Sequence, residues 1–236
     1  MINFDEFIVW IVSSALLGIL LSTQFQWPIL SIEPADLLLM FAFSLVMLFI
    51  YVAGQKIAAW YYNCDIKIKF LSFRQYWFRD TYRFKWPFPL WLVLPVLLFL
   101  ITAGKFKWLA IMGFDIEAKT GRIRKRFSNI DDVDVAKIVV AGPAASLIFA
   151  LILKVVGLAS LAIYPALLAF LTCIPIGSGF KILAGSRNLT VFFLVLTGVM
   201  LFLIPLAGWF PTLIVGLLTI VHCSCLLCYI RTIEVS

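Results

Sequence analysis

The chain has 236 residues, of which 64% are hydrophobic and only 13% are charged. Soluble globular proteins are about 45–50% apolar, and several apolar stretches here reach the roughly 20 residues that cross a bilayer. This composition excludes a soluble globular domain and predicts an integral, multi-pass membrane protein. The formal charge of +7 does not indicate nucleic-acid binding, because Lys and Arg in a membrane protein mainly determine its topology.

The first two apolar segments are expected at residues 7–22 and 37–62. The acidic N-terminus has no basic n-region, so we expect the first segment to be retained rather than cleaved as a signal peptide. Residues 65–70 then alternate polar and apolar side chains, which predicts a strand with one buried face. The basic and aromatic stretch 67–86 suits anionic lipid headgroups and suits plain topology determination equally well.

Residues 87–102 are apolar but contain three prolines, and Lys105 and Lys107 follow at once. Basic residues on both sides indicate that both ends lie on one membrane face. We therefore predict a re-entrant or interfacial hairpin here rather than a full span. Farther along, residues 114–118 and 122–124 flank a short turn that contains glycine, the pattern of a β-hairpin.

Four further apolar helices are expected, at residues 133–156, 158–174, 189–209 and 212–229. The predicted fold is a mainly α membrane protein: a polytopic helical bundle of about six transmembrane helices, with a re-entrant and β-hairpin region between the second and third spans. We expect residues 1–236 to form a single membrane domain. Its parts are the first two spans at 7–62, a cytoplasmic-side strand and hairpin region at 63–132, and four spans at 133–230. The positive-inside rule then places both termini in the cytoplasm.

Three short motifs occur in order along these segments. The second span contains Tyr51-Val52-Ala53-Gly54-Gln55, in the frame of the H-E-x-G-H motif, where two His one turn apart bind zinc and Glu is the general base. The helix at 133–156 contains Ala141-Gly142-Pro143-Ala144-Ala145-Ser146, in the frame of A-G-P-x-x-N. The third motif, Pro175-Ile176-Gly177-Ser178-Gly179-Phe180-Lys181-Ile182, is in the frame of P…D-G-x-K-I.

Through these motifs, over about residues 37–190, the chain resembles the site-2 protease family of intramembrane zinc metalloproteases. Members of this family also carry a strand and hairpin region between the first two motifs. The resemblance implies a motif framework of small and helix-breaking residues, with Ser146 where the family has Asn. The framework positions are Gly54, Gly142, Pro143, Ser146, Pro175 and Gly179.

The departures from the family pattern occur where the chemistry takes place. The resemblance implies zinc ligands at three positions, which here hold Tyr51, Gln55 and Ser178, and a catalytic Glu at the position of Val52. Zinc is bound by thiolate, imidazole or carboxylate, and a Val side chain cannot take a proton from metal-bound water. We therefore expect no catalytic residue at these positions and no bound zinc.

The resulting hypothesis is an inactive family homologue that binds or regulates transmembrane segments of other proteins within the lipid bilayer. An edge strand of the region around residues 65–73 would receive an extended peptide by strand addition. One alternative is a small transporter or channel with Tyr51, Gln55 and Ser178 in its path. Another is an active intramembrane protease with non-standard ligands.

A polar cluster near the C-terminus lies outside these motifs. It consists of His222, Cys223, Cys225 and Cys228. Three of these residues share one helix face and suit a soft metal. Buried free thiols are the favoured interpretation, because Cys behaves as a small hydrophobic residue.

Overall fold

The computed structural model describes residues 4–26, 29–31, 34–75, 83–118, 132–174 and 178–206. The described chain is mostly helical, with short strands between the helices. The helices are α1 (Phe4–Ser22), α2 (Pro34–Tyr61), α3 (Leu90–Ile101), α4 (Asp132–Val155), α5 (Ala159–Cys173), α6 (Ser178–Gly185) and α7 (Arg187–Leu206). The strands are β1 (Gln24–Gln26), β2 (Ile29–Ser31), β3 (Cys64–Phe70), β4 (Phe73–Gln75), β5 (Arg83–Phe88) and β6 (Met112–Ala118).

Four of the described helices, α1, α2, α4 and α7, are long and apolar enough to cross a membrane. The structure is mainly α-helical, as predicted, and these four helices are consistent with a membrane protein. The predicted span at 158–174 corresponds to α5, which is apolar but has only 15 residues. The predicted span at 212–229 and the cluster at His222 lie outside the described residues. Exposed apolar side chains along the four long helices suit contact with lipid.

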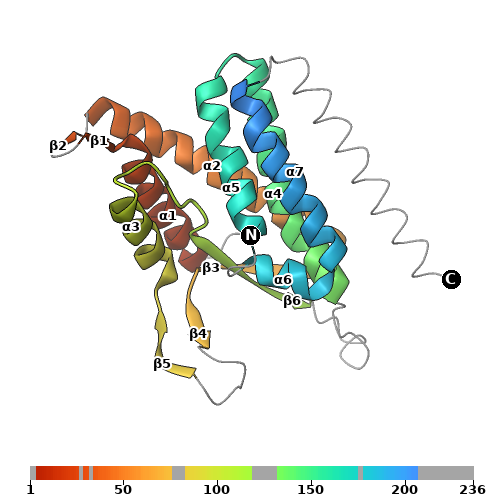
Figure 1. Ribbon diagram of the computed structural model, residues 1–236. Helices are drawn as coiled ribbons and strands as arrows, with labels where there is room; N and C mark the ends of the chain where they lie inside the picture. Colours follow the sequence, from red (N-terminus) through yellow and green to blue (C-terminus); the bar gives the residue numbers. More distant parts are fainter. Residues whose placement is uncertain are drawn as a thin grey trace.

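α2 lies between two groups of helices, with α1 packed on one side and α4 on the other (Figure 1). α4, α5 and α7 lie side by side, and the short α6 packs across the first turns of α4. Pro34 begins α2, a position where a missing backbone N–H costs nothing. α4 carries Asp132 and Asp134 in its first turn and Lys154 in its last, which complements the helix dipole at both ends.

Lys154 is a basic residue buried between α4 and α7. Its side chain is buried, and its ammonium donates to the backbone carbonyl of Ile204 in the last turn of α7. Carbonyls in the last turn of a helix have no intrahelical partner and carry the negative end of the dipole. Lys154 therefore joins the ends of α4 and α7.

β3 and β6 form an antiparallel pair in which Ile68 lies opposite Phe114. Along β3, Cys64, Ile66 and Ile68 are buried while the residues between them are exposed. This confirms the strand predicted from the alternating pattern, with one face on the helices and one in solvent. β6 pairs with β3, and the arm predicted at 122–124 lies outside the described residues.

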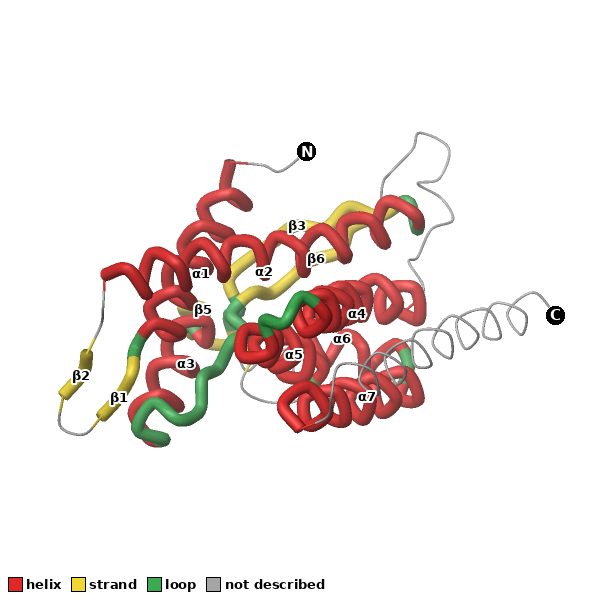
Figure 2. The backbone as a smooth tube through the Cα atoms, turned by 90° about the horizontal axis from the view of Figure 1, so that it is seen from above, coloured by secondary structure: helices red, strands yellow, loops and turns green. Residues whose placement is uncertain are grey.

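The segment from α3 to β6 is a hairpin whose two legs both return to Leu71, the residue after β3. Leu71 accepts a hydrogen bond from Trp91 N–H at 2.9 Å and donates one to the Ile111 carbonyl at 2.9 Å. Between these points, α3 forms one leg and an extended segment forms the other (Figure 2). A hairpin is therefore present, but residues Leu90–Ile101 form one continuous helix and the return leg follows it, so the predicted turn within residues 87–102 was wrong.

The tip of this hairpin lies elsewhere than we expected. The Lys107 ammonium donates to the carbonyls of Leu21, at 3.0 Å, and Thr23, at 3.4 Å, at the C-terminal end of α1. The start of α3, in contrast, lies beside Glu6 in the first turn of α1. The two ends of the apolar segment therefore lie at opposite ends of α1, not on one face. Carbonyls at a helix C-terminus attract an ammonium, an interaction that a count of basic residues does not consider.

Candidate functional site

Tyr51 and Gln55 lie one turn apart on the face of α2 that contacts α4. Each side chain is only 1% exposed. The Gln55 amide nitrogen, Nε2, lies 3.4 Å from the Tyr51 hydroxyl and 3.3 Å from the Val139 carbonyl of α4. The first motif is therefore in contact with the helix that carries the second.

The bond to Val139 has a specific cause in the second motif. Pro143 lies inside α4 and has no N–H, so the carbonyl four residues earlier loses its intrahelical donor. That carbonyl belongs to Val139, and the Gln55 side chain supplies the missing hydrogen bond from another helix. In this chain, Gln55 satisfies a polar group inside the bundle, where an unsatisfied carbonyl costs about 1–3 kcal/mol.

Small residues of the two motifs bring the helices together. A Cβ atom on Gly54 would lie 2.6 Å from Ala145 Cβ and 2.8 Å from the Ala141 carbonyl oxygen. A Cβ atom on Gly142 would lie 2.9 Å from Gln55 Cγ and 2.9 Å from Tyr51 Cε2. Each glycine therefore faces the other motif, in the small-residue packing that lets transmembrane helices approach closely.

This assignment predicts an interaction between two substitutions. Gln55→Leu should lower the free energy of unfolding by about 1–2 kcal/mol, because the Val139 carbonyl loses its donor. In a Pro143→Ala background the residue-143 N–H bonds that carbonyl, so the same substitution should cost about 1 kcal/mol less. Denaturation midpoints in mixed SDS micelles, followed by circular dichroism, measure all four proteins. Equal costs in both backgrounds would contradict the assignment.

Two buried polar atoms in this contact have no hydrogen-bond partner among the described residues. They are Oε1 of Gln55 and Oγ of Ser146, and Ser146 is 1% exposed. Ser146 lies one turn beyond Gly142 on α4, so both residues face the same side of the helix. The α2–α4 contact therefore contains a carboxamide, a phenol and a hydroxyl, all suited to hydrogen bonding.

None of these groups resembles a zinc ligand or a strong base. Tyr51 and Gln55 offer a phenol and an amide where the H-E-x-G-H motif has imidazoles, and the Val52 side chain is a buried hydrocarbon. No three His, Cys, Asp or Glu side chains within the described part of the chain are grouped so as to hold a metal ion. The expectation that the protein binds no zinc stays a prediction.

The third motif approaches the first through β6. Ser178 and Gly179 begin α6, while the Ser178 side chain and all of Pro175 lie outside the described residues. Lys181 donates to the Phe114 carbonyl of β6. The Phe114 ring lies 5.7 Å from the Tyr51 ring, centroid to centroid. α6 also packs on α4. Ile182 of α6 is 1% exposed and belongs to the same hydrophobic core as Val139 of α4.

The solvent face of the β3–β6 pair carries alternating charges. Lys67 lies 2.7 Å from Glu117 and Lys69 lies 2.6 Å from Asp115, diagonally across the strands. The hydrogen bond from Lys69 holds the pKa of Asp115 below its ordinary value; burial opposes this shift and the charge of Lys181 supports it. The hydrogen bond to Glu117 raises the pKa of Lys67.

At the tip of the hairpin that follows α3, burial lowers the pKa of Lys107.

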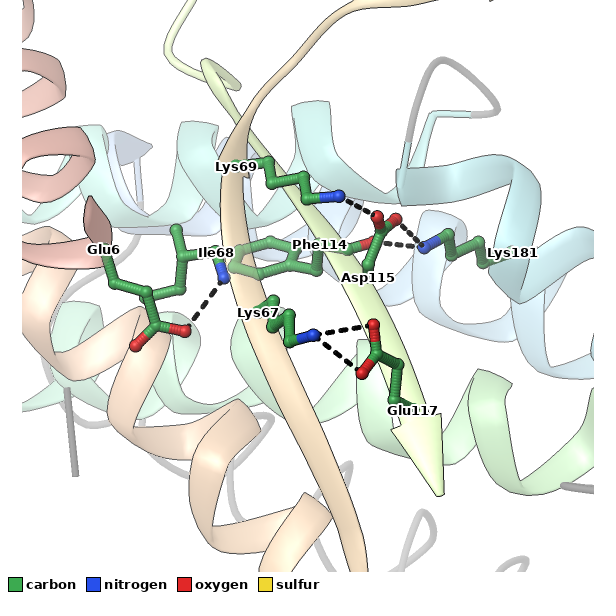
Figure 3. A network of polar contacts seen from close by, with 8 residues as sticks. All are labelled: Glu6, Lys67, Ile68, Lys69, Phe114, Asp115, Glu117 and Lys181. Atoms are coloured by element: carbon green, nitrogen blue, oxygen red, sulfur yellow. Dashed lines mark hydrogen bonds and ion pairs between the residues drawn. The ribbon is translucent and has the colours of Figure 1, made fainter. Parts of the chain in front are cut away.

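The two outer edges of this sheet are occupied at the same cross-strand pair (Figure 3). Ile68 N–H donates to the Glu6 carboxylate of α1 at 3.2 Å, and the Phe114 carbonyl accepts from Lys181 of α6. Both backbone groups therefore point away from the sheet, as they do at a non-hydrogen-bonded pair of an antiparallel ladder. Because the pattern repeats every second residue, Ile66 and Phe70 also direct their backbone groups to the outer edge of β3.

A cavity of about 610 Å³ lies beside that edge. Its walls are the first turns of α1, residues 67–70 of β3 and the start of α3. Phe70 and Trp91 line it and stack with ring centroids 4.4 Å apart. The cavity therefore combines an apolar wall with the polar backbone edge of a strand. A second, smaller groove of about 340 Å³ lies on the outer face of α2 beside Val52, and neither is lined by Tyr51 or Gln55.

Sequence reasoning did not identify Glu6 as a site residue. Its other carboxylate oxygen lies 2.7 Å from Lys56 of α2, and its side chain is only 7% exposed. An acidic residue at the start of an otherwise apolar helix was the available signal, since a buried charge near a membrane needs a partner.

Comparison with known proteins adds no relative. No protein-family model, no curated protein and no solved structure matches this chain. A relation to the site-2 protease family therefore depends on the motif residues and on how they pack.

Proposed function

We propose that this protein is a catalytically inactive homologue of the site-2 intramembrane metalloproteases that binds segments of other membrane proteins without cleaving them. The packing of the first motif on the second, through Gly54 and Gly142, supports a common ancestry with that family. The residues at the ligand positions make hydrogen bonds inside the bundle, as Gln55 does with Val139. This favours a structural role for α2 over a reaction centre.

The observation that carries the binding function is the cavity beside the outer edge of β3. Backbone groups at a strand edge bond to an added strand, and adjacent side-chain pockets supply specificity. The Phe70–Trp91 wall suits an apolar side chain of a bound peptide. Lys67 and Lys69, on the solvent face, suit polar ones. The favoured ligand is an extended juxtamembrane segment with alternating apolar and polar residues.

We also propose a topology of six spans with both termini in the cytoplasm. Besides the four long helices, α5 would supply the fourth span and residues 212–229 the sixth, and the β3–β6 sheet would lie on the cytoplasmic side. Labelling of single introduced cysteines by a membrane-impermeant maleimide in sealed vesicles tests this arrangement.

The binding function is tested with a defined peptide. The probe has about 20 Leu and Ala residues, enough for one span, followed by an alternating Val-Ser segment and a fluorophore. A photoreactive amino acid replaces Ser72, which lines the cavity, or Phe202, which is exposed on α7. We expect crosslinking of the probe from position 72 and not from position 202. Equal crosslinking from both positions would overturn the proposal.

The absence of cleavage is tested in the same samples. After incubation with the protein and added zinc, the mass of the probe should remain that of the intact peptide. Cleavage that requires the protein and is lost on chelation would show an active protease. Elemental analysis that found one zinc ion per purified chain would contradict the predicted loss of the metal site.

A further inference from the structure

The outer edge of β3 is already occupied by a side chain of the same protein. Glu6, on the first turn of α1, accepts the Ile68 N–H through one carboxylate oxygen at 3.2 Å. The corresponding edge of β6 is occupied by Lys181 at the Phe114 carbonyl. Figure 3 shows both charged groups approaching the pair from opposite sides.

A strand that added to β3 would need the position that Glu6 holds. In an antiparallel pair, each outward N–H of one strand bonds to a carbonyl of the next. A peptide carbonyl opposite Ile68 would therefore replace the Glu6 oxygen, and both cannot bond there with good geometry. The cavity lies on this side of the sheet and is lined by Glu6 itself.

We propose that Glu6 is a built-in competitor for peptide binding, which must leave the Ile68 N–H before a strand can add to β3. This inference depends on the proposed function for the nature of the ligand, an extended peptide. Beyond that function, the inference names the Ile68 N–H as the group for which Glu6 and the peptide compete. It also fixes the register of the bound strand, with a peptide carbonyl opposite Ile68.

Lys56 makes this exchange possible. Its ammonium lies 2.7 Å from the second carboxylate oxygen of Glu6, and its side chain is 27% exposed. When a peptide carbonyl takes the Ile68 N–H, Glu6 keeps a charge partner that has access to water. The displaced carboxylate is therefore not left as an isolated buried charge, which would cost several kcal/mol.

Two substitutions at one position test the competition. Glu6→Ala removes the acceptor, and the probe peptide should bind about tenfold more tightly than to the wild-type protein, since a hydrogen bond to a charged group no longer has to be broken. Glu6→Gln keeps an acceptor oxygen in place, so its affinity should lie between the two. Fluorescence anisotropy of the probe in detergent micelles gives the three dissociation constants. Lys181→Met, on the other edge of the sheet, is the matched control and should leave the affinity unchanged.

Each outcome decides between the two proposals. If the wild-type protein binds the probe and neither Glu6 variant binds it more tightly, Glu6 is not a competitor and the binding function stands. If none of the proteins binds the probe, both the binding function and the competition fail. Should Glu6→Ala not fold, as judged by gel filtration and circular dichroism, the Gln variant still decides, because weaker or equal binding there overturns the competition.

Discussion

Replacing Gly54 by Ala should lower the free energy of unfolding by about 3 kcal/mol, the upper part of the range for an overpacked core. The new methyl group would lie 2.6 Å from Ala145 Cβ and 2.8 Å from the Ala141 carbonyl oxygen. Neither atom belongs to a flexible side chain, so the two helices have to separate. Separation also lengthens the bond from Gln55 to Val139, already 3.3 Å long.

A second glycine provides the control for this prediction. A Cβ atom on Gly198 of α7 would lie 3.5 Å from the nearest atom of the Phe170 ring, an ordinary contact. Gly198→Ala should therefore leave stability unchanged or raise it by up to about 1 kcal/mol, through helix propensity. Denaturation midpoints in mixed SDS micelles compare the two variants. Equal midpoints would show that α2 and α4 do not approach as closely as described.

Lys56→Met should lower the free energy of unfolding by about 2–3 kcal/mol. It leaves the Glu6 carboxylate, whose side chain is 7% exposed, without the charge of Lys56. Breaking a fully buried ion pair costs about 3–5 kcal/mol, and the 27% exposure of Lys56 reduces that figure. The same denaturation experiment measures the loss.

The double variant Lys56→Met with Glu6→Gln separates charge from packing. The neutral amide still accepts the Ile68 N–H but has no charge to be compensated, so most of the lost stability should return. Lys69→Met is a surface control, because that lysine pairs with Asp115 while its side chain is 60% exposed. It should have a far smaller effect. A double variant as unstable as Lys56→Met alone would contradict a role for charge.

Local patterns in the sequence predicted much of the fold. Alternation at residues 65–70 predicted β3, and the apolar runs predicted the four long helices. Prolines and flanking lysines predicted a hairpin within residues 87–102, whereas residues Leu90–Ile101 form the single helix α3 and the chain turns back only after it. The tip of that hairpin was placed wrongly, because the position of Lys107 depends on carbonyls of α1, far away in the sequence. Elements that depend on neighbouring residues were predicted well, whereas contacts between residues distant in sequence were not predicted.

In the candidate site, too, local features were predicted and long-range contacts were not. The spacing of Tyr51 and Gln55 placed both on one helix face, and both are buried there. The partner of Gln55 could not be predicted, because it follows from Pro143 on a different helix. Glu6 was missed for a related reason: nothing near it in sequence reveals that Ile68 N–H points toward it. The transporter alternative gains no support, since Tyr51 and Gln55 pack against Gly142.

The two hydrogen bonds at Leu71 connect the hairpin of α3 and its return leg to the strand beside the cavity. Leu71 directly follows β3 and holds both legs of the hairpin, while Lys107 at the tip holds the far end of α1. Glu6, at the near end of α1, holds β3 itself. α1, the hairpin and β3 are therefore linked in a closed ring of contacts that reaches from one end of α1 to the other. Because the two contacts lie at opposite ends of α1, a movement of this helix relative to the hairpin would strain the Glu6 bond to Ile68 and the Lys107 bonds to α1 together.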